Sequence, residues 1–447
     1  MKKLVILALV TALAAGVVFA QEVEVTGFYR VGVDAFGSSS MTRIDSNGEK
    51  ISDYIRAGAT HSRGRLNFTA ANDDGTFGGF VRVESDLLRS IDNLGYPTGA
   101  ASFFNMPYAF AWWQPIEQLK LTAGLFDDFY VNDIVDTFGG VAEDTLVHYT
   151  GYESLFLDPF AQHYDDGAGL GVGIYPIEGL SLNIGVPFIL GPGGVGSHAG
   201  GVADGLISWA GLGETAKEVY GHVKVQAVYE LEDTVRIALG FHAVPKDSQA
   251  IAWNFDDTTG EGTGAVSVSN SAIFLAGYIT AIENMGINIG LKFTLPWEDK
   301  DAKVTYNSPF QIGLGFNYNM DAFGIGARLG FALGSSVKPE NVDAIKGPFM
   351  FGLNILPSYD LGVCKIFLNA GIGMVALDAD FKKDVKDLFG FEPKDGFAFH
   401  INPYVEKSIG GGSFFVGFKL FADAFDLDAD DKAIINWSVP CGMRFAF

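Results

Sequence analysis

Apolar residues recur at every second position through much of this chain, and this alternation constrains its fold more than any other feature. It is clearest in residues 235–243, 286–295, 310–319 and 323–331. In each segment one set of alternate positions is aliphatic or aromatic, while the other set is glycine, amide or base. A period of two residues is typical of β-strands whose two faces meet different surroundings. The alternation therefore predicts an all-β protein.

The composition indicates what the apolar face of these strands contacts. The chain is 48% hydrophobic and only 19% charged, with a mean hydropathy of +0.21. Even so, no segment after residue 20 approaches the roughly 18 consecutive apolar residues of a membrane helix. Only helices and closed barrels satisfy all backbone hydrogen bonds inside a bilayer. We therefore expect a transmembrane antiparallel β-barrel in which every second residue faces lipid.

The connections between the expected strands alternate in length. Short links are expected near 73–75, 115–117, 176–179, 231–233, 283–284, 320–321, 358–360 and 409–412. Longer, acidic or glycine- and serine-rich connections are expected near 37–57, 89–104, 127–163, 191–217, 245–269, 297–307, 335–345, 378–394 and 427–432. Short periplasmic turns that alternate with long outer loops are typical of membrane barrels. Residues 21–447 are thus predicted to form one barrel of about 18 strands, with 16 as the alternative, wide enough to hold water.

The first twenty residues have the pattern of a cleavable signal peptide. Lys2 and Lys3 precede an apolar stretch, and small residues end at Ala20. This order of charge, apolar core and small-residue site predicts cleavage after Ala20 and export from the cytoplasm. The net charge of −23 argues against a nucleic-acid partner, because phosphate binding needs a cationic surface.

The last strand carries the most specific motif in the chain. Apolar residues occupy alternate positions up to a C-terminal aromatic, and Pro440 is the one departure from an ideal strand. This pattern resembles the terminal signature of Gram-negative-type outer-membrane proteins. The resemblance implies an outer-membrane location, contact with lipid, and recognition by the barrel-assembly machinery. The residues of this assembly signal are Trp437, Val439, Met443, Phe445 and Phe447.

The two cysteines have two possible interpretations. Cys364 and Cys441 could pair outside the cytoplasm. Both are expected at lipid-facing positions of different strands, which favours two small free hydrophobic side chains.

A segment after residue 118 resembles part of the general porins. Leu119–Leu125 reads as a strand that continues into an acidic stretch ending at Gly140. This is similar to the fifth strand and third loop of that family, in which the loop folds into the barrel. The resemblance implies an inward-folded loop at 127–163 and a homotrimer. It would place Asp127, Asp128, Asp133 and Asp136 at a constriction; the alternative is a solvated outer loop.

Basic residues on the strands are expected to point inward, because a cation facing lipid at mid-bilayer costs about 2–4 kcal/mol. Such a wall facing an acidic loop would create a transverse field that favours polar solutes. Arg63, Arg65 and Arg82 form the best cluster; the alternative is a structural ladder with acids such as Glu84. The predicted pore-lining cations are Arg63, Arg65, Arg82, Lys120, Arg236, Lys292 and Arg328, with Arg30, Lys224, Lys419 and Arg444 on the same face.

An aromatic cluster between Phe103 and Trp113 has two interpretations. Inward rings could guide sugars by stacking, whereas rings at headgroup depth would form an interfacial girdle, which is the commoner arrangement.

These patterns favour a porin, a passive channel for small polar solutes or ions. One alternative is a FadL-like transporter of hydrophobic compounds, which would need a plug before a first strand that already begins near Val23. The other is a non-conducting surface adhesin, which would pack larger apolar residues inside. Residues 426–431 start like a calcium loop but lack its glycine and closing glutamate, and the histidines lack metal-ligand spacing. With no nucleophile motif either, the sequence predicts no enzyme, metal or cofactor.

Overall fold

The structure is a computed structural model of the chain. It describes residues 22–39, 43–44, 50–51, 54–55, 58–59, 63–85, 105–126, 167–189, 223–244, 250–255, 262–299, 304–306, 310–333, 337–339, 349–380, 382–383, 386, 395–427 and 433–447.

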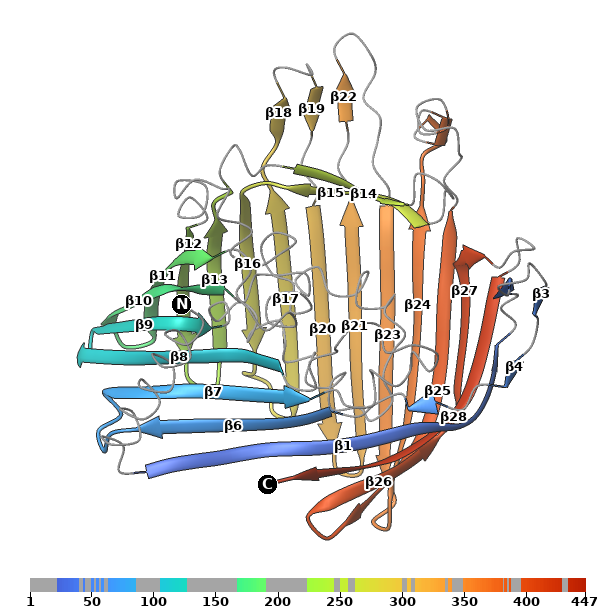
Figure 1. Cartoon of the computed structure of the whole chain (residues 1–447), viewed down its shortest axis with the longest axis horizontal. Helices are drawn as coiled ribbons and strands as arrows, with labels where there is room; N and C mark the ends of the chain where they lie inside the picture. Colours follow the sequence, from blue (N-terminus) through green and yellow to red (C-terminus); the bar gives the residue numbers. More distant parts are fainter. Residues whose placement is uncertain are drawn as a thin grey trace.

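The described strands form one closed antiparallel barrel (Figure 1). Its wall is a 21-stranded sheet, in which β4, β5 and β6 form one interrupted strand and β26 and β27 form another, so that the barrel has 18 strands. The prediction of about 18 is confirmed over the alternative of 16. In order around the ring the strands are β1 (Glu22–Ser39), β4 (Tyr54–Ile55) with β5 (Gly58–Ala59) and β6 (Arg63–Ala71), β7 (Phe77–Ser85), β8 (Asn105–Ile116), β9 (Leu119–Phe126), β10 (Gly167–Ile177), β11 (Leu180–Ile189), β12 (Lys224–Leu231), β13 (Val235–His242), β16 (Ala272–Ile279), β17 (Met285–Thr294), β20 (Phe310–Met320), β21 (Phe323–Leu333), β23 (Phe349–Asp360), β24 (Lys365–Ala376), β25 (Gly396–Ile409), β26 (Gly412–Gly417) with β27 (Lys419–Leu427), and β28 (Ala433–Ala446).

The barrel closes between its first and last strands. β1 pairs with β28 on one side and with β6 on the other. Two backbone hydrogen bonds join Gly27 to the C-terminal Phe447, at 2.8 and 3.0 Å. A Cβ at Gly27 would overlap the carbonyl oxygen of Arg65, so β1 approaches β6 closely only because residue 27 is glycine. The seam therefore depends on both chain ends.

Seven of the eight short links occur where the alternation predicted them. Several use residues in the left-handed region: φ is 53° at Asp233, 61° at Asn284 and 48° at Asp321. Asn and Asp tolerate this region better than most non-glycine residues, which explains their place in tight hairpins.

The link predicted at 358–360 is displaced along the chain. Ser358 and Tyr359 remain in the ladder opposite β24, and the turn lies at residues 361–364. Cys364 therefore lies in a turn and not on a lipid-facing strand, which corrects that placement. Both cysteines are free.

The nine longer connections leave the opposite end of the barrel. Their described parts include β2 (Arg43–Ile44) with β3 (Lys50–Ile51), β14 (Ala250–Phe255) with β15 (Gly262–Ser269), and β18 (Trp297–Asp299), β19 (Val304–Tyr306) and β22 (Val337–Pro339). The β14–β15 hairpin lies across the ends of the strands in Figure 1, and β15 contacts β27. This hairpin connects two separate parts of the mouth.

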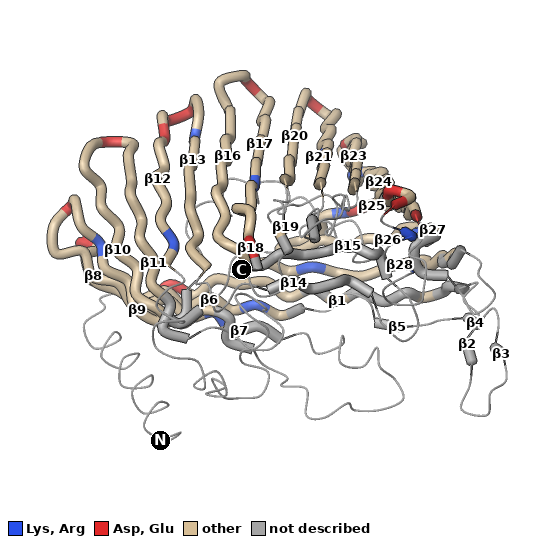
Figure 2. Tube along the Cα trace, turned by 90° about the horizontal axis from the view of Figure 1, so that it is seen from above, with Lys and Arg blue, Asp and Glu red and all other residues tan. Residues whose placement is uncertain are grey.

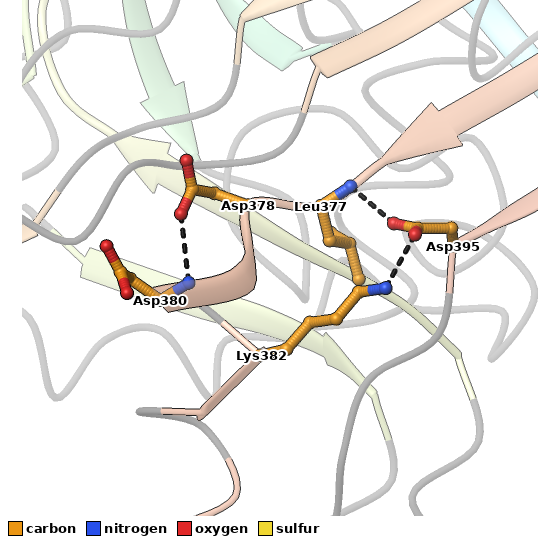
Figure 3. A network of polar contacts seen from close by, with 5 residues as sticks. All are labelled: Leu377, Asp378, Asp380, Lys382 and Asp395. Atoms are coloured by element: carbon orange, nitrogen blue, oxygen red, sulfur yellow. Dashed lines mark hydrogen bonds and ion pairs between the residues drawn. The ribbon is translucent and has the colours of Figure 1, made fainter.

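The β24–β25 connection is held at its base by polar contacts (Figure 3). One carboxylate oxygen of Asp395 accepts a hydrogen bond from the Leu377 amide at 2.6 Å, and the other pairs with Lys382 at 2.5 Å. The Asp378 carboxylate accepts from the Asp380 amide at 2.9 Å, as a residue that caps a helical turn does. Residues 379–380, 382–383 and 386 are helical.

The two faces of the wall differ as the alternation predicted. Along β13, Leu239 is 53% exposed on the outside, whereas its neighbour Ala238 is 0% exposed on the inside. The same contrast runs through β25, where Ile401 faces out and Asn402 faces in. Within the described ranges, no helix is long and apolar enough to cross a membrane.

Candidate functional site

The pairing register aligns the backbones of neighbouring strands, so that register partners form rows across the wall. One row runs through Arg444 on β28, Arg30 on β1 and Arg63 on β6. The adjoining positions hold Arg65 on β6 and, one strand further, Arg82 on β7. The structure thus brings the three predicted arginines onto adjacent strands with two more, and we call the surface of β28, β1 and β6–β9 the basic wall.

Aromatic rings support the guanidinium groups of the basic wall. Phe28 lies between the guanidinium carbons of Arg65 and Arg444, which are 5.3 and 5.5 Å from its ring centre. The Arg82 guanidinium lies 4.5 Å from the ring of Tyr108, and its Nε donates to Asn67 at 2.9 Å. Contacts of a cation with an aromatic face are attractive and limit its motion. These arginines are therefore held along the wall.

The predicted aromatic cluster contributes to the inner surface as well as to the outside. Tyr108, on the inward row, is 7% exposed, and the Lys120 ammonium lies 5.2 Å from the ring of Trp112. Trp113 faces outward and is 53% exposed. The rings of β8 thus alternate between the two sides of the wall.

The other predicted cations do not join this cluster. Arg236 lies beside Glu230 at 3.5 Å, near the short β12–β13 turn. The Lys292 ammonium lies 5.9 Å from the ring of Phe274, and Arg328 is paired with Asn354 in the register of β21 and β23. The inward cations are thus distributed around the ring.

The acidic half of the predicted constriction lies outside the described residues. This applies to Asp127, Asp128, Asp133 and Asp136, and to the whole loop 127–163. The backbone of Glu84 pairs with that of Arg65 across β6 and β7, which places the two residues at the same level of the wall.

The far wall, β16–β25, is mainly amide and glycine. Asn288, Asn369, His400 and Asn402 are all buried on the inward face. Inward glycines separate them at positions 313, 315, 326, 330, 352, 371 and 373. The sequence alone does not identify these amides, because an isolated Asn in an alternating strand belongs to no motif; only the register brings them together.

Acidic residues mark the short-turn end of the barrel (Figure 2). Among the eight short turns, only Gly410–Gly411 has no acid in it or directly beside it. At one turn the hydroxyl and amide of Thr76 donate to Asp74, at 2.6 and 3.0 Å, and hold the pKa of that carboxyl below its ordinary value. Asp74 therefore stays charged to lower pH than a free aspartate.

Metal-binding groups are not found in the described parts of the chain, where no three or more His, Cys, Asp or Glu residues lie close enough together to hold an ion.

Comparisons with known proteins show which solved structures share this fold. No family model matches the sequence, and no curated protein does. Among solved structures, the chain is similar to the outer membrane channel DcaP of Acinetobacter baumannii, with a TM-score of 0.50, 11% identity, and coverage of 95% of this chain and 97% of that one. It is also similar to OccK9 of Pseudomonas aeruginosa, with a TM-score of 0.51, 12% identity, and coverage of 96% and 100%. The chain thus has the closed antiparallel β-barrel fold that these outer-membrane porins share.

Proposed function

We propose that this protein is a porin, a passive channel of the outer membrane for small polar solutes and ions. The observation that carries the proposal is the inner surface of the 18-strand ring, where glycine, amide and basic residues replace the apolar residues of the outer face. Barrels of this strand number enclose an aqueous interior. A polar wall gives hydrophobic compounds little to bind, and a non-conducting adhesin would gain stability from a packed apolar interior. Both alternatives are therefore less well supported.

We also propose how the protein reaches its location. Cleavage after Ala20 would release a chain whose β1 starts at Glu22. On β28, Trp437, Met443 and Phe445 face outward, so their rings and side chains are available to the barrel-assembly machinery and then to lipid. We include the homotrimer in the proposal; crosslinking of the purified protein in detergent would test it, and a single monomer band would contradict it.

The basic wall supports a preference for anions. Its arginines line the interior, where less water surrounds them and their field is stronger. The acids of the short turns lie at the rim in contact with solvent, where salt screens them. We therefore expect the positive charge of the basic wall to affect ion selectivity more than the negative charge of the rim.

Conductance of the purified protein in a planar bilayer tests the proposal. Stepwise currents are expected, with a reversal potential under a potassium chloride gradient that shows chloride preference. Absence of steps would contradict the channel, and a reversal potential of opposite sign would contradict the anion preference.

Exchange of arginines should identify the selective surface. Arg65→Ser with Arg82→Ser removes two adjacent cations, so the chloride-to-potassium permeability ratio should fall severalfold. Lys292→Ser, on the far wall, is the matched control and should change the ratio less. Equal effects of the two changes would mean that the basic wall does not determine selectivity.

A further inference from the structure

We infer that the far wall contains a binding subsite for small hydroxylated carboxylates, such as sugar acids and hydroxy acids. It consists of Asn354 on β23, Asn369 on β24, and His400 and Asn402 on β25, hereafter the amide cluster. The inference rests on the proposed channel, because the solute must enter the lumen to reach it.

The amide cluster occupies inward positions. Its chain neighbours Ile355, Leu368 and Ile401 are the exposed, lipid-facing members of the same strands. Because successive side chains of a strand point to opposite faces, the four polar residues point into the barrel. They therefore line the path of a solute.

Polar contacts join three members of the cluster. The Asn354 side-chain nitrogen donates to Asn369 Oδ1 at 3.1 Å and lies 3.3 Å from His400 Nε2, which is itself 3.1 Å from Asn369 Oδ1. The His400 ring lies over Gly371, where a Cβ would overlap its Cε1 atom. The imidazole fits against the wall only because that position is glycine.

Two of the amides retain unused hydrogen-bonding capacity. Asn369 and Asn402 are both 0% exposed. Within the described part of the chain, Asn369 Nδ2 and both Nδ2 and Oδ1 of Asn402 have no hydrogen-bond partner. Buried polar atoms without partners are costly, so a bound group that supplied the missing hydrogen bonds would stabilise the cluster. A hydroxyl, which both donates and accepts, matches this combination of two donors and one acceptor.

An apolar layer closes the short-turn side of the amide cluster. On the same face, Phe367 lies next to Asn369 and Tyr404 next to Asn402, in both cases toward the short turns. Their rings stack, with centroids 4.6 Å apart and an interplanar angle of 4°. Leu356 and Phe415 pack against them. This layer excludes water from one side, and hydrogen bonds made in such surroundings are stronger than those in bulk water.

A positive charge stands next to the amides. Arg328 on β21 is the register partner of Asn354, and such partners have Cβ atoms about 4.5–5.5 Å apart. Inward glycines at 326 and 330 flank Arg328 on its own strand, which leaves space around its long side chain. A guanidinium binds carboxylates in a two-pronged geometry. A ligand that binds both Arg328 and the amide cluster therefore carries a carboxylate and hydroxyl groups.

Asn354 provides the access to the cluster. It is partly exposed, whereas Asn369 and Asn402 are buried. A solute in the lumen therefore contacts Asn354 first, and Asn354 is hydrogen-bonded to Asn369.

Block of chloride current in a planar bilayer tests the subsite. Gluconate, sorbitol and butyrate are compared, because they carry both groups, hydroxyls alone and a carboxylate alone. Gluconate should block saturably at the lowest concentration. Asn402→Leu should raise its half-blocking concentration about tenfold, the usual effect of one lost buried hydrogen bond. Arg328→Gln should weaken gluconate block and leave sorbitol unchanged.

Gln226→Leu is the matched control, because Gln226 on β12 is also a buried inward amide with no described partner for either side-chain atom. It should leave gluconate block unchanged. Retention of the compact, heat-sensitive band in SDS gels shows that each variant forms a barrel. The subsite is disproved if gluconate blocks no better than sorbitol or butyrate, or if Asn402→Leu and Gln226→Leu have equal effects. Chloride currents would persist in either case, which separates this failure from failure of the channel itself.

Discussion

At the scale of single residues, glycine decides how polar side chains lie on the inner wall. Asn183 lies against Gly173, Asn317 against Gly286, and His400 against Gly371. In each pair the side chain rests on a neighbouring strand at a position without a Cβ. The lumen therefore holds polar groups along its wall without being filled by them.

Gly371→Ala tests this arrangement. The new methyl would overlap the His400 ring, which Asn369 holds in place, so the barrel should lose about 1–3 kcal/mol of stability and the cluster should be distorted. Urea unfolding followed by tryptophan fluorescence measures the loss. Gly326→Ala is the control, because its methyl would meet only Leu356, at an ordinary 3.8 Å. A loss no larger than that of the control would show that the ring is not confined.

At the scale of elements, pairing of the two chain ends decides whether the barrel closes. β1 has β28 on one side and β6 on the other, and Gly27 is the point at which both neighbours are close. Strand pairing between such distant segments gains no help from a short turn. Its stability comes from the ladder itself and from side chains across it, such as Phe28 between Arg65 and Arg444.

Gly27→Ala should weaken this seam, because its methyl meets the Arg65 carbonyl and only movement of the backbone relieves the contact. The fraction of refolded protein that runs as a compact barrel in SDS gels should fall. Gly64→Ala, on the same pair of strands, meets a Tyr29 ring carbon at a tolerable 3.4 Å and should behave like the original chain. Similar yields for both variants would refute the close contact at Gly27.

At the scale of the whole molecule, two sets of charges act on a permeating ion. The basic wall is formed by residues of the strands, and the acids lie at the short-turn rim (Figure 2). Salt screens exposed charges over about 8 Å at physiological ionic strength and over about 3 Å at 1 M. The rim should therefore lose its influence first as salt rises.

Reversal potentials at several salt concentrations measure this difference. Chloride preference should first rise as the rim is screened and then fall toward the ratio of the free ions in molar salt. Removing two rim charges with Glu232→Gln and Asp233→Asn should reduce the initial rise in chloride preference. Replacing Arg65 and Arg82 with Ser should lower the chloride preference at every salt concentration. A preference that does not vary with salt would contradict long-range control by charge.

The sequence by itself determined the barrel and most of its short turns, and it predicts a single domain and an inward side for the strand cations. Those features follow from the free energy of one residue at a time: an arginine in lipid is costly wherever it occurs, and glycine or aspartate marks a turn from its own backbone preference. It could not separate 18 strands from 16, because the first strand and residues 89–127 show no regular alternation. The structure also places the turn predicted at 358–360 at residues 361–364, because pairing with β24 holds Ser358 and Tyr359 in their strand. Only the tertiary structure decided which inward residues meet. The register places Arg444 opposite Arg30 across the first and last strands, and it brings Asn354 into contact with His400 across β24; no single-residue preference encodes that pairing.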